Sequence, residues 1–262
     1  EVPEPGADYY AACDVPHGEV RARWYYSPST ARWRRAHVYT PPDYDAHPQQ
    51  RYPVLYLQHG AGEDERGWVA QGRANFILDN LLAAGRLTPM IVVMDCGYAL
   101  KEGEPLPTRG GSSHYAAFEQ VLVHEVIPMV DATYRTLPDR EHRAMAGLSM
   151  GSMQTMTITF RHLDLFAWIG SFSGPVLPRD GSGIEQAYGG LLVNPALNDQ
   201  IRLLWIGGGT AEPRNYEPAK AVHEAMQAAG VRHVFFSSEG TSHEWQTWRR
   251  CLYDFAPRLF RG

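Results

Sequence analysis

Residues 142–161 read HRAMAGLSMGSMQTMTITFR and contain the pattern that decides the fold. Residues 142–148 are short and apolar, as a buried strand requires, whereas 150–161 carry apolar residues at helical spacing. Gly147-Leu148-Ser149-Met150-Gly151 joins the two, so a G-x-S-x-G sequence lies at a predicted strand-to-helix turn. This context indicates a sharp turn that projects the Ser149 side chain above a sheet.

The same alternation of short apolar stretches and longer helical patterns continues along the chain, which is typical of β-α-β units around a mostly parallel sheet. The predicted parallel strands are 53–59, 90–95, 142–148, 166–172, 202–206 and 233–237. Alternating polar and apolar residues predict an antiparallel N-terminal hairpin from 19–27 and 34–40, ended by Pro41-Pro42. The predicted flanking helices are 74–84, 116–134, 150–161, 217–229 and 244–260, and Pro128 predicts a kink or a break in the second. We therefore predict an α/β fold of the α/β-hydrolase type.

The length of 262 residues fits a single domain that spans residues 1–262. Two stretches rich in Gly, Pro and Asn, 97–113 and 174–199, lack periodicity. Both follow strands of the predicted sheet, at the edge where α/β sheets bind ligands. We expect them to form the walls of a substrate site.

Composition excludes several classes of partner. A net charge of -5 provides no basic surface for nucleic acid, and no apolar run reaches the length of a membrane helix. The chain begins with Glu1 rather than Met, so we expect a secreted or periplasmic protein whose signal peptide has been removed; excision from a longer multidomain protein is the alternative. The three isolated cysteines are expected to be small buried residues, and a bridge between Cys13 and Cys251 stays open if the chain ends meet.

A serine at such a turn can carry out acyl transfer only if an oxyanion hole holds the charge of the tetrahedral intermediate. The N–H of Met150, at the start of the helix, is one predicted donor. The loop after the strand 53–59 reads His59-Gly60-Ala61-Gly62, and its small residues let backbone amides approach a substrate. We predict Ala61 as the second donor, with Gly62 behind it, and a structural role for His59.

In this fold the catalytic residues follow the order serine, acid, histidine. His243 comes after the last predicted strand, and a neutral imidazole can accept the proton that makes a serine hydroxyl nucleophilic. Glu212 is the first carboxylate after the strand 202–206 and is predicted to orient His243, with Glu217 as the reserve; a solvated loop charge is the alternative for Glu212. Of the other histidines considered for the base, His223 is predicted to lie on the surface of a helix, and the rest are predicted to be structural: His142, His162 and His233.

The chain resembles the esterase family that includes bacterial feruloyl esterases and acetyl xylan esterases of carbohydrate esterase family 1, and more distantly S-formylglutathione hydrolases and mycolyltransferases. The resemblance covers nearly the whole chain and rests on residues 14–18 (DVPHG), 38–42 (VYTPP), 52–60 (YPVLYLQHG), 147–151 (GLSMG) and 243–245 (HEW). It implies Ser149 and His243 as nucleophile and histidine, and 59–61 as the oxyanion loop. The chain departs from the family pattern twice: Glu212 stands where many members have aspartate, and Ser152 where many have a second glycine after the elbow.

The resemblance implies a serine esterase that hydrolyses feruloyl (hydroxycinnamoyl) esters of plant cell-wall xylan through an acyl-enzyme, with acetylated xylan as the runner-up substrate. Such chemistry needs no metal or organic cofactor, and the expected partner is a small-molecule or polysaccharide ester. An acyltransferase and a non-catalytic carbohydrate-binding homologue are the rival classes. The predicted substrate contacts are Trp245, Tyr98 and Gly62; Trp168 and Trp205 are further candidates for a sugar-binding surface, with packing in the core as their alternative.

Overall fold

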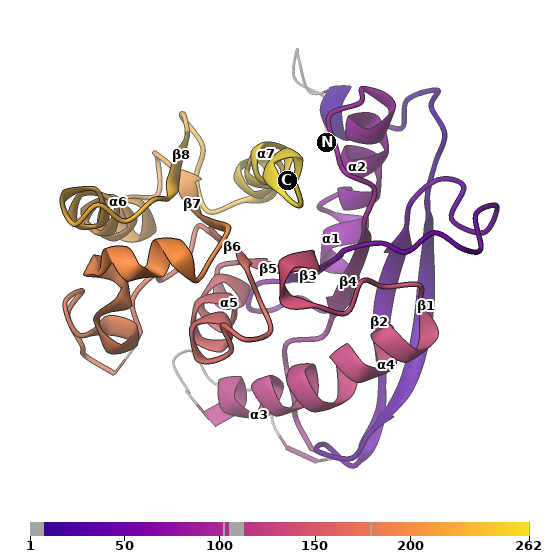
Figure 1. Ribbon diagram of the computed structural model, residues 1–262, viewed down its shortest axis with the longest axis horizontal. Coiled ribbons are helices and arrows are strands. Elements are labelled where there is room, and N and C mark those ends of the chain that lie inside the picture. Colours follow the sequence, from indigo (N-terminus) through magenta and orange to yellow (C-terminus); the bar gives the residue numbers. More distant parts are fainter. Residues whose placement is uncertain (1–7, 102, 105–112, 179, 262) are drawn as a thin grey trace.

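The computed structural model describes residues 8–101, 103–104, 113–178 and 180–261. Its strands form one eight-stranded sheet in the order β1-β2-β4-β3-β5-β6-β7-β8 (Figure 1). The strands are β1 (Glu19–Ser27), β2 (Arg32–Thr40), β3 (Val54–Gln58), β4 (Ile91–Asp95), β5 (Arg143–Leu148), β6 (Trp168–Phe172), β7 (Leu203–Gly209) and β8 (Val234–Ser238). The N-terminal hairpin β1-β2 is antiparallel and joins β4 antiparallel, whereas β3 to β8 pair in parallel. The predicted fold class is confirmed.

Helices cover both faces of this sheet. The helices are α1 (Gly67–Ala70), α2 (Ala74–Ala83), α3 (Ser113–Val121), α4 (Ile127–Thr133), α5 (Met150–Arg161), α6 (Pro213–Ala228) and α7 (Trp245–Phe255). One core cluster joins α2 and α7 to one face of the central strands, through residues such as Leu55 and Val92. Their neighbours Val54 and Val93 face the opposite side, under α3 and α4.

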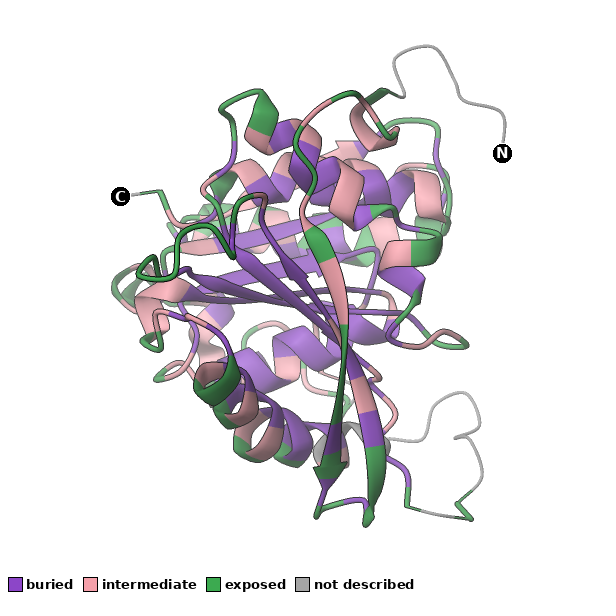
Figure 2. Cartoon of the chain, turned by 90° about the vertical axis from the view of Figure 1, so that its right-hand side faces the viewer, coloured by how far each residue is buried: buried purple, intermediate pink, exposed green. Residues whose placement is uncertain are grey.

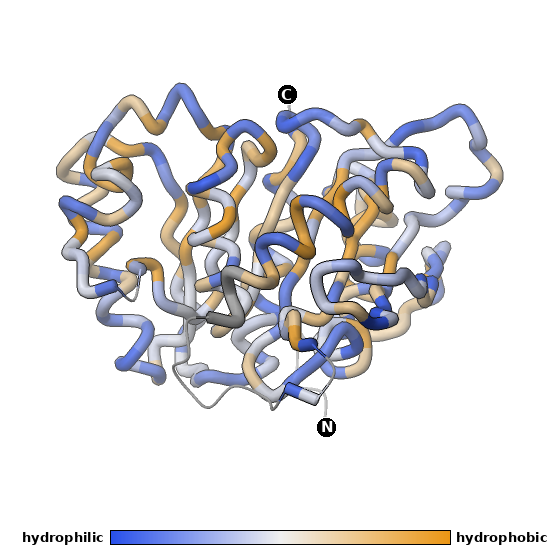
Figure 3. Tube along the Cα trace, turned by 90° about the horizontal axis from the view of Figure 1, so that it is seen from below, coloured by the Kyte–Doolittle hydropathy of each residue, from blue (hydrophilic) through white to orange (hydrophobic). Residues whose placement is uncertain are grey.

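Burial on both faces explains the composition of the central strands. Every residue of β3, β4, β5 and β6 is buried, and Figure 2 shows these strands as a buried layer between the helices. Hydrophobic segments accordingly concentrate in the interior, and hydrophilic ones in the outer loops (Figure 3). A parallel strand covered on both sides gains from apolar residues at every position, so it reads as a continuous apolar run.

Most predicted elements lie within a few residues of the observed ones, with three differences. Pro128 does not break its helix: a π-helical segment, Leu122–Val126, connects α3 to α4 just before Pro128, so the helix changes type where the proline lacks a donor. Helix α6 begins at Pro213 rather than at 217, because proline is well suited to the first helical position. Residues 174–199 contain two short 3₁₀ segments, Ala187–Val193 and Pro195–Asp199. Residues 102 and 105–112 of the other predicted wall lie outside the described residues.

The three cysteines are free thiols. Cys251 is buried, as expected for a small core residue, but Cys13 and Cys96 are partly exposed. The bridge considered between Cys13 and Cys251 is not formed; the Cys13 thiol contacts the Asp8 carbonyl instead. No helix in the described part of the chain has the length and apolar character that a membrane crossing requires.

Candidate active site

Ser149 lies in the tight turn between β5 and α5. Its backbone has φ 54° and ψ −109°, a conformation that costs energy for a residue with a side chain. The turn is possible because the residues two positions before and two positions after Ser149 are glycine. A Cβ at Gly147 would lie 2.5 Å from the Gly151 backbone, and one at Gly151 would lie 2.6 Å from the His59 carbonyl. The Ser149 N–H donates to the Phe172 carbonyl at 2.9 Å, which holds the turn against β6.

The loop between β8 and α7 brings His243 to this serine. The Nε2 atom of His243 lies 2.9 Å from the Ser149 Oγ, although the two residues are 94 positions apart. The imidazole also packs edge-on against Trp248 of α7, with ring centroids 5.1 Å apart. The hydroxyl and the imidazole are therefore placed for direct proton transfer.

Glu212 lies on the other side of the imidazole. Its Oε2 is 2.7 Å from the His243 Nδ1, and the carboxylate is buried at the end of the β7–α6 connection. The Asn215 side chain donates to Oε2 at 2.9 Å, and the Gly209 N–H donates to Oε1 at 3.0 Å. Glu217, the reserve acid, is exposed on α6 and has no hydrogen bond to His243 among the described residues, so that alternative is wrong.

Opposing effects determine the charge of Glu212. Burial raises the pKa of this carboxyl, but hydrogen bonds from His243, Asn215 and the Gly209 backbone outweigh burial and leave the pKa below its ordinary value. Glu212 is thus ionised near neutral pH. A carboxylate at Nδ1 favours the tautomer in which Nδ1 carries the proton and Nε2 accepts one from Ser149.

The loop after β3 lies beside the serine. A Cβ at Gly60 would lie 3.5 Å from the Ser149 Cβ, so the backbone of this loop borders the nucleophile. The Ala61 N–H donates to no acceptor in the described part of the chain, and the Met150 N–H, in the first turn of α5, has no acceptor in a preceding turn. The Gly62 N–H, the second choice for the oxyanion hole, instead donates to the Tyr98 hydroxyl at 2.8 Å. The loop therefore leaves Ala61, not Gly62, with an open donor.

His59 supports this loop. Its Nε2 accepts from the Gly97 N–H at 2.9 Å, so Nδ1 carries the proton and donates to the Gly60 carbonyl at 2.8 Å. Burial lowers the pKa of His59, which keeps the ring neutral in this arrangement. His59 is placed to join the loops that follow β3 and β4.

A second carboxylate, Glu63, lies against the same loop. Its Oε2 accepts from the Gly60 N–H at 3.3 Å. Burial raises the pKa of Glu63 above its ordinary value; hydrogen bonds from Gly60 and Trp245 and the charge of His243 offset only part of that effect. No pattern in the sequence singles out Glu63, because an acidic residue in a loop is usually solvated.

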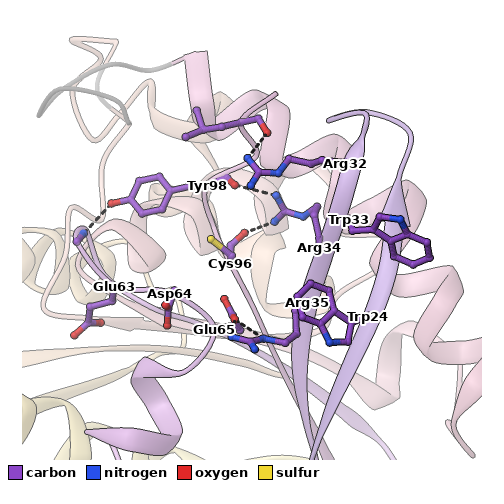
Figure 4. A pocket seen from close by; sticks show the side chains of 12 residues that line it. Trp24, Arg32, Trp33, Arg34, Arg35, Glu63, Asp64, Glu65, Cys96 and Tyr98 are labelled. Carbon is purple, nitrogen blue, oxygen red and sulfur yellow. Dashed lines mark hydrogen bonds and ion pairs between the residues drawn. The ribbon is translucent and has the colours of Figure 1, made fainter. Parts of the chain in front are cut away.

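Strand β2 holds the two loops through its arginines (Figure 4). Arg34 is buried and donates to the Tyr98 carbonyl at 2.9 Å and to the Cys96 carbonyl, while it pairs with Asp95 at 3.2 Å. Arg35 donates to the Glu65 carboxylate at 2.8 Å. Together with the bond between Gly62 and Tyr98, these contacts fix both loops to the N-terminal hairpin.

The aromatic residues proposed as substrate contacts lie in different environments. Trp168 and Trp205 are buried in the core, 7% and 0% exposed, so neither forms a sugar-binding surface. Trp245 is half-buried and packs edge-on against Trp68 and Trp248 at 5.3 and 5.2 Å. Tyr98 and Gly62 line a pocket of about 400 Å³ beside the oxyanion loop.

The structure adds information on two residues near the site, Asn215 and Ser152. Asn215 escaped notice because helix α6 was expected to begin later; Pro213 marks the true start and places Asn215 one turn after Glu212. Ser152 is fully buried and hydrogen-bonds to Ser171 at 2.6 Å. This hydroxyl is therefore occupied away from the nucleophile.

The chain matches a family model described as "Putative esterase" over residues 27–259. It belongs to this esterase family. Among curated relatives, the endo-1,4-beta-xylanase/feruloyl esterase of Xylanibacter ruminicola is 39% identical over 267 residues, which cover 100% of this chain and 34% of that protein. The endo-1,4-beta-xylanase Y of Acetivibrio thermocellus is 32% identical and matches 85% of this chain but 21% of its own length. The esterase chain thus spans only a part of these longer relatives.

Solved structures give a similar result. The CE1 ferulic acid esterase AmCE1/Fae1A from Anaeromyces mucronatus, without substrate, superposes with a TM-score of 0.78 at 26% identity, and covers 97% of this chain and 95% of that one. The same enzyme in complex with ferulic acid gives a TM-score of 0.78 at 25% identity, with 96% and 94% coverage. The esterase fold of this chain therefore corresponds to nearly the whole of a structure solved with a bound phenolic acid.

Proposed function

We propose that this chain is a serine esterase that hydrolyses feruloyl or related hydroxycinnamoyl esters of xylan. One observation carries the proposal: His243 lies within hydrogen-bond distance of both the Ser149 hydroxyl and the Glu212 carboxylate, at 2.9 and 2.7 Å. This is the arrangement that activates a serine for attack on an ester.

In the acylation step, the Ser149 Oγ forms a bond to the ester carbonyl carbon while its proton passes to the His243 Nε2. The carbonyl oxygen becomes negative and accepts hydrogen bonds from the Ala61 and Met150 N–H groups. Collapse of this intermediate breaks the bond to the sugar oxygen, which takes the proton from His243. The products of this step are the free sugar hydroxyl and an acyl group esterified to Ser149.

In the deacylation step, His243 removes a proton from water as the water oxygen attacks the acyl carbon. The same two N–H groups hold the second oxyanion, and the proton then returns to the Ser149 Oγ as the acid leaves. Glu212, ionised and buried, stabilises the imidazolium that forms in each half of the reaction.

The comparisons support the substrate class. One curated relative is named a xylanase/feruloyl esterase, and a structural neighbour was solved with ferulic acid. A hydroxycinnamoyl ester on xylan agrees with both names. Export from the cytoplasm, where such a polysaccharide would be met, stays a prediction.

Replacement of the nucleophile tests the proposal. Ser149→Ala should lower kcat on methyl ferulate by about six orders of magnitude, because no other group can form the acyl-enzyme. The matched control is Ser152→Ala, in the first turn of α5, which should keep most of the activity. Hydrolysis that survives Ser149→Ala would remove Ser149 from the mechanism. A wild-type preference for acetylated xylan over methyl ferulate would overturn the hydroxycinnamoyl assignment.

A further inference from the structure

Three large aromatic side chains are exposed on the N-terminal hairpin. Trp24, Tyr26 and Trp33 are 56%, 52% and 64% exposed. The register pairs Tyr26 with Trp33, and Trp24 with Arg35, so these side chains project from the same face of the hairpin. We call Trp24, Tyr26 and Trp33 the aromatic face.

The opposite side of the same strands is packed into the protein at Tyr25 and Arg34. Tyr25 and Arg34, which pair with each other in the register, are 7% and 6% exposed. The aromatic face is therefore not needed to fill the core, and it leaves a large apolar area in water. Exposed apolar areas of this kind commonly mark a binding surface.

Two residues of the aromatic face, Trp24 and Trp33, line the pocket of about 400 Å³ beside the active site (Figure 4). Trp24, Trp33 and Arg32 line it from the hairpin, and Gly62, Glu63 and Tyr98 line it from the two loops. Gly62 directly follows Ala61, whose open N–H faces no acceptor in the described part of the chain. The pocket thus begins one residue from the proposed oxyanion hole.

Contacts with Arg35 hold Trp24, one member of the aromatic face, in place. The Arg35 guanidinium lies over the Trp24 ring at 5.3 Å and donates to Glu65 at 2.8 Å. Glu65 belongs to the loop that carries Ala61, so the ring and the loop are linked through one side chain. A preorganised surface binds a ligand with a smaller loss of side-chain entropy.

We propose that this pocket and the aromatic face bind the carbohydrate part of the ester, the xylan chain that becomes the leaving alcohol. The inference rests on the proposed esterase function and extends it to the sugar side of the substrate. Axial C–H groups of a pyranose carry partial positive charge and pack on the electron-rich faces of tryptophan and tyrosine. The polar groups of the pocket suit hydroxyls: Arg32 donates N–H bonds, Glu63 accepts, and Tyr98 has its own proton to donate.

The shape of the surface favours sugar over the phenolic acyl group. A hydroxycinnamoyl ring is planar and apolar and is best bound in a slot that covers most of its surface. The aromatic face is open, each of its three residues is more than half exposed, and it extends over two strands. A polysaccharide that continues beyond the reacting ester can lie along such a surface.

Binding of a carbohydrate without any ester tests the site directly. Unsubstituted xylo-oligosaccharide is titrated into Ser149→Ala protein, and the affinity is compared after adding Trp24→Ala or Trp33→Ala. Each substitution should weaken binding by about tenfold, as expected for the loss of one aromatic contact. The control is Arg23→Ala, an exposed neighbour in β1 whose side chain projects from the opposite face. Unchanged binding in both tryptophan variants, or an equal loss in the control, overturns the proposal.

Kinetics separate the sugar side from the acyl side. Trp24→Ala and Trp33→Ala should raise KM on feruloylated xylo-oligosaccharide by about tenfold while kcat/KM on methyl ferulate stays within twofold. An equal decrease in kcat/KM on both esters would show that the aromatic face does not recognise the carbohydrate. If the wild-type chain hydrolyses no feruloyl ester, the proposed function fails, and the titration with unsubstituted xylo-oligosaccharide still decides whether the aromatic face binds sugar.

Discussion

Both ring nitrogens of His243 are engaged, and this fixes what each can do. Nδ1 faces the Glu212 carboxylate at 2.7 Å and Nε2 faces the Ser149 hydroxyl at 2.9 Å. Glutamate is one methylene longer than aspartate, the other carboxylate that could fill this role. The longer side chain still meets Nδ1, because Gly209 and Asn215 hold both carboxylate oxygens.

Loss of the carboxylate should impair turnover more than binding. Glu212→Ala is expected to lower kcat on methyl ferulate by roughly 10³- to 10⁴-fold, with KM little changed, because the imidazolium loses its counter-charge and its preferred tautomer. Steady-state kinetics check this. Glu217→Ala, an exposed carboxylate five residues further on, is the control and should retain wild-type kcat. Equal losses in the two variants would contradict the role given to Glu212.

The raised pKa of Glu63 predicts that the free energy of unfolding depends on pH. Burial raises the pKa of Glu63 in the folded chain, so the folded state holds this proton more tightly than the unfolded state does. Its contribution to the free energy of unfolding is therefore greatest below the unfolded pKa and decreases as pH rises through the raised folded pKa. Glu63→Gln should remove this decrease, and the variant should gain stability relative to wild type as pH rises from 4 to 7. Urea unfolding across this pH range measures the difference; a constant difference between the two proteins would contradict the account.

Among single residues, the sequence predicted those that belong to a motif but not those that reach the site only through contacts in the folded chain. Ser149 and His243 were predictable because their roles demand a fixed position relative to a strand and a helix. Asn215, Glu63 and Trp248 carry no such pattern. Each takes part in the site only because distant segments meet there.

Strand β2 joins the edge of the sheet to the site. Its alternation predicted a hairpin, but not that Arg34 would be buried beside Asp95 and Tyr25, which lie 61 and 9 positions away in the sequence. The cost of burying a charged side chain is offset by its hydrogen-bond and ion-pair partners, and the alternation of polar and apolar residues does not reveal these partners. The exposure of Trp24 and Trp33 was missed for a related reason: alternation places both on one face of the hairpin but does not show whether another part of the chain covers that face.

Removal of Arg34 should destabilise the whole fold. Arg34→Ala leaves the Asp95 carboxylate buried without its cation and should lower the free energy of unfolding by about 3–5 kcal/mol. Arg32→Ala, an exposed arginine in the same strand, should cost less than about 1 kcal/mol. Urea unfolding of both variants provides the measurement. Similar losses in the two would show that the buried pair does not stabilise the fold.

The whole molecule follows from a simple pattern. Short apolar runs separated by helical segments predicted the strands to within a few residues. The reason is that a parallel strand covered on both faces needs apolar residues at nearly every position. The strand order and the placement of loops could not be predicted in this way. They depend on which faces pack together, as in the two clusters on opposite sides of β3 and β4.

The central claim is that one fold brings Ser149, His243 and Glu212 together for covalent catalysis. The most direct test is to quench a reaction with a hydroxycinnamoyl ester in acid and map the modified peptide by mass spectrometry. The account predicts a hydroxycinnamoyl increment on the peptide that contains Ser149, absent from Ser149→Ala protein. Two results for the wild-type protein would contradict covalent catalysis by Ser149. One is hydrolysis with the hydroxycinnamoyl increment on another side chain; the other is hydrolysis with no increment under conditions where deacylation limits the rate.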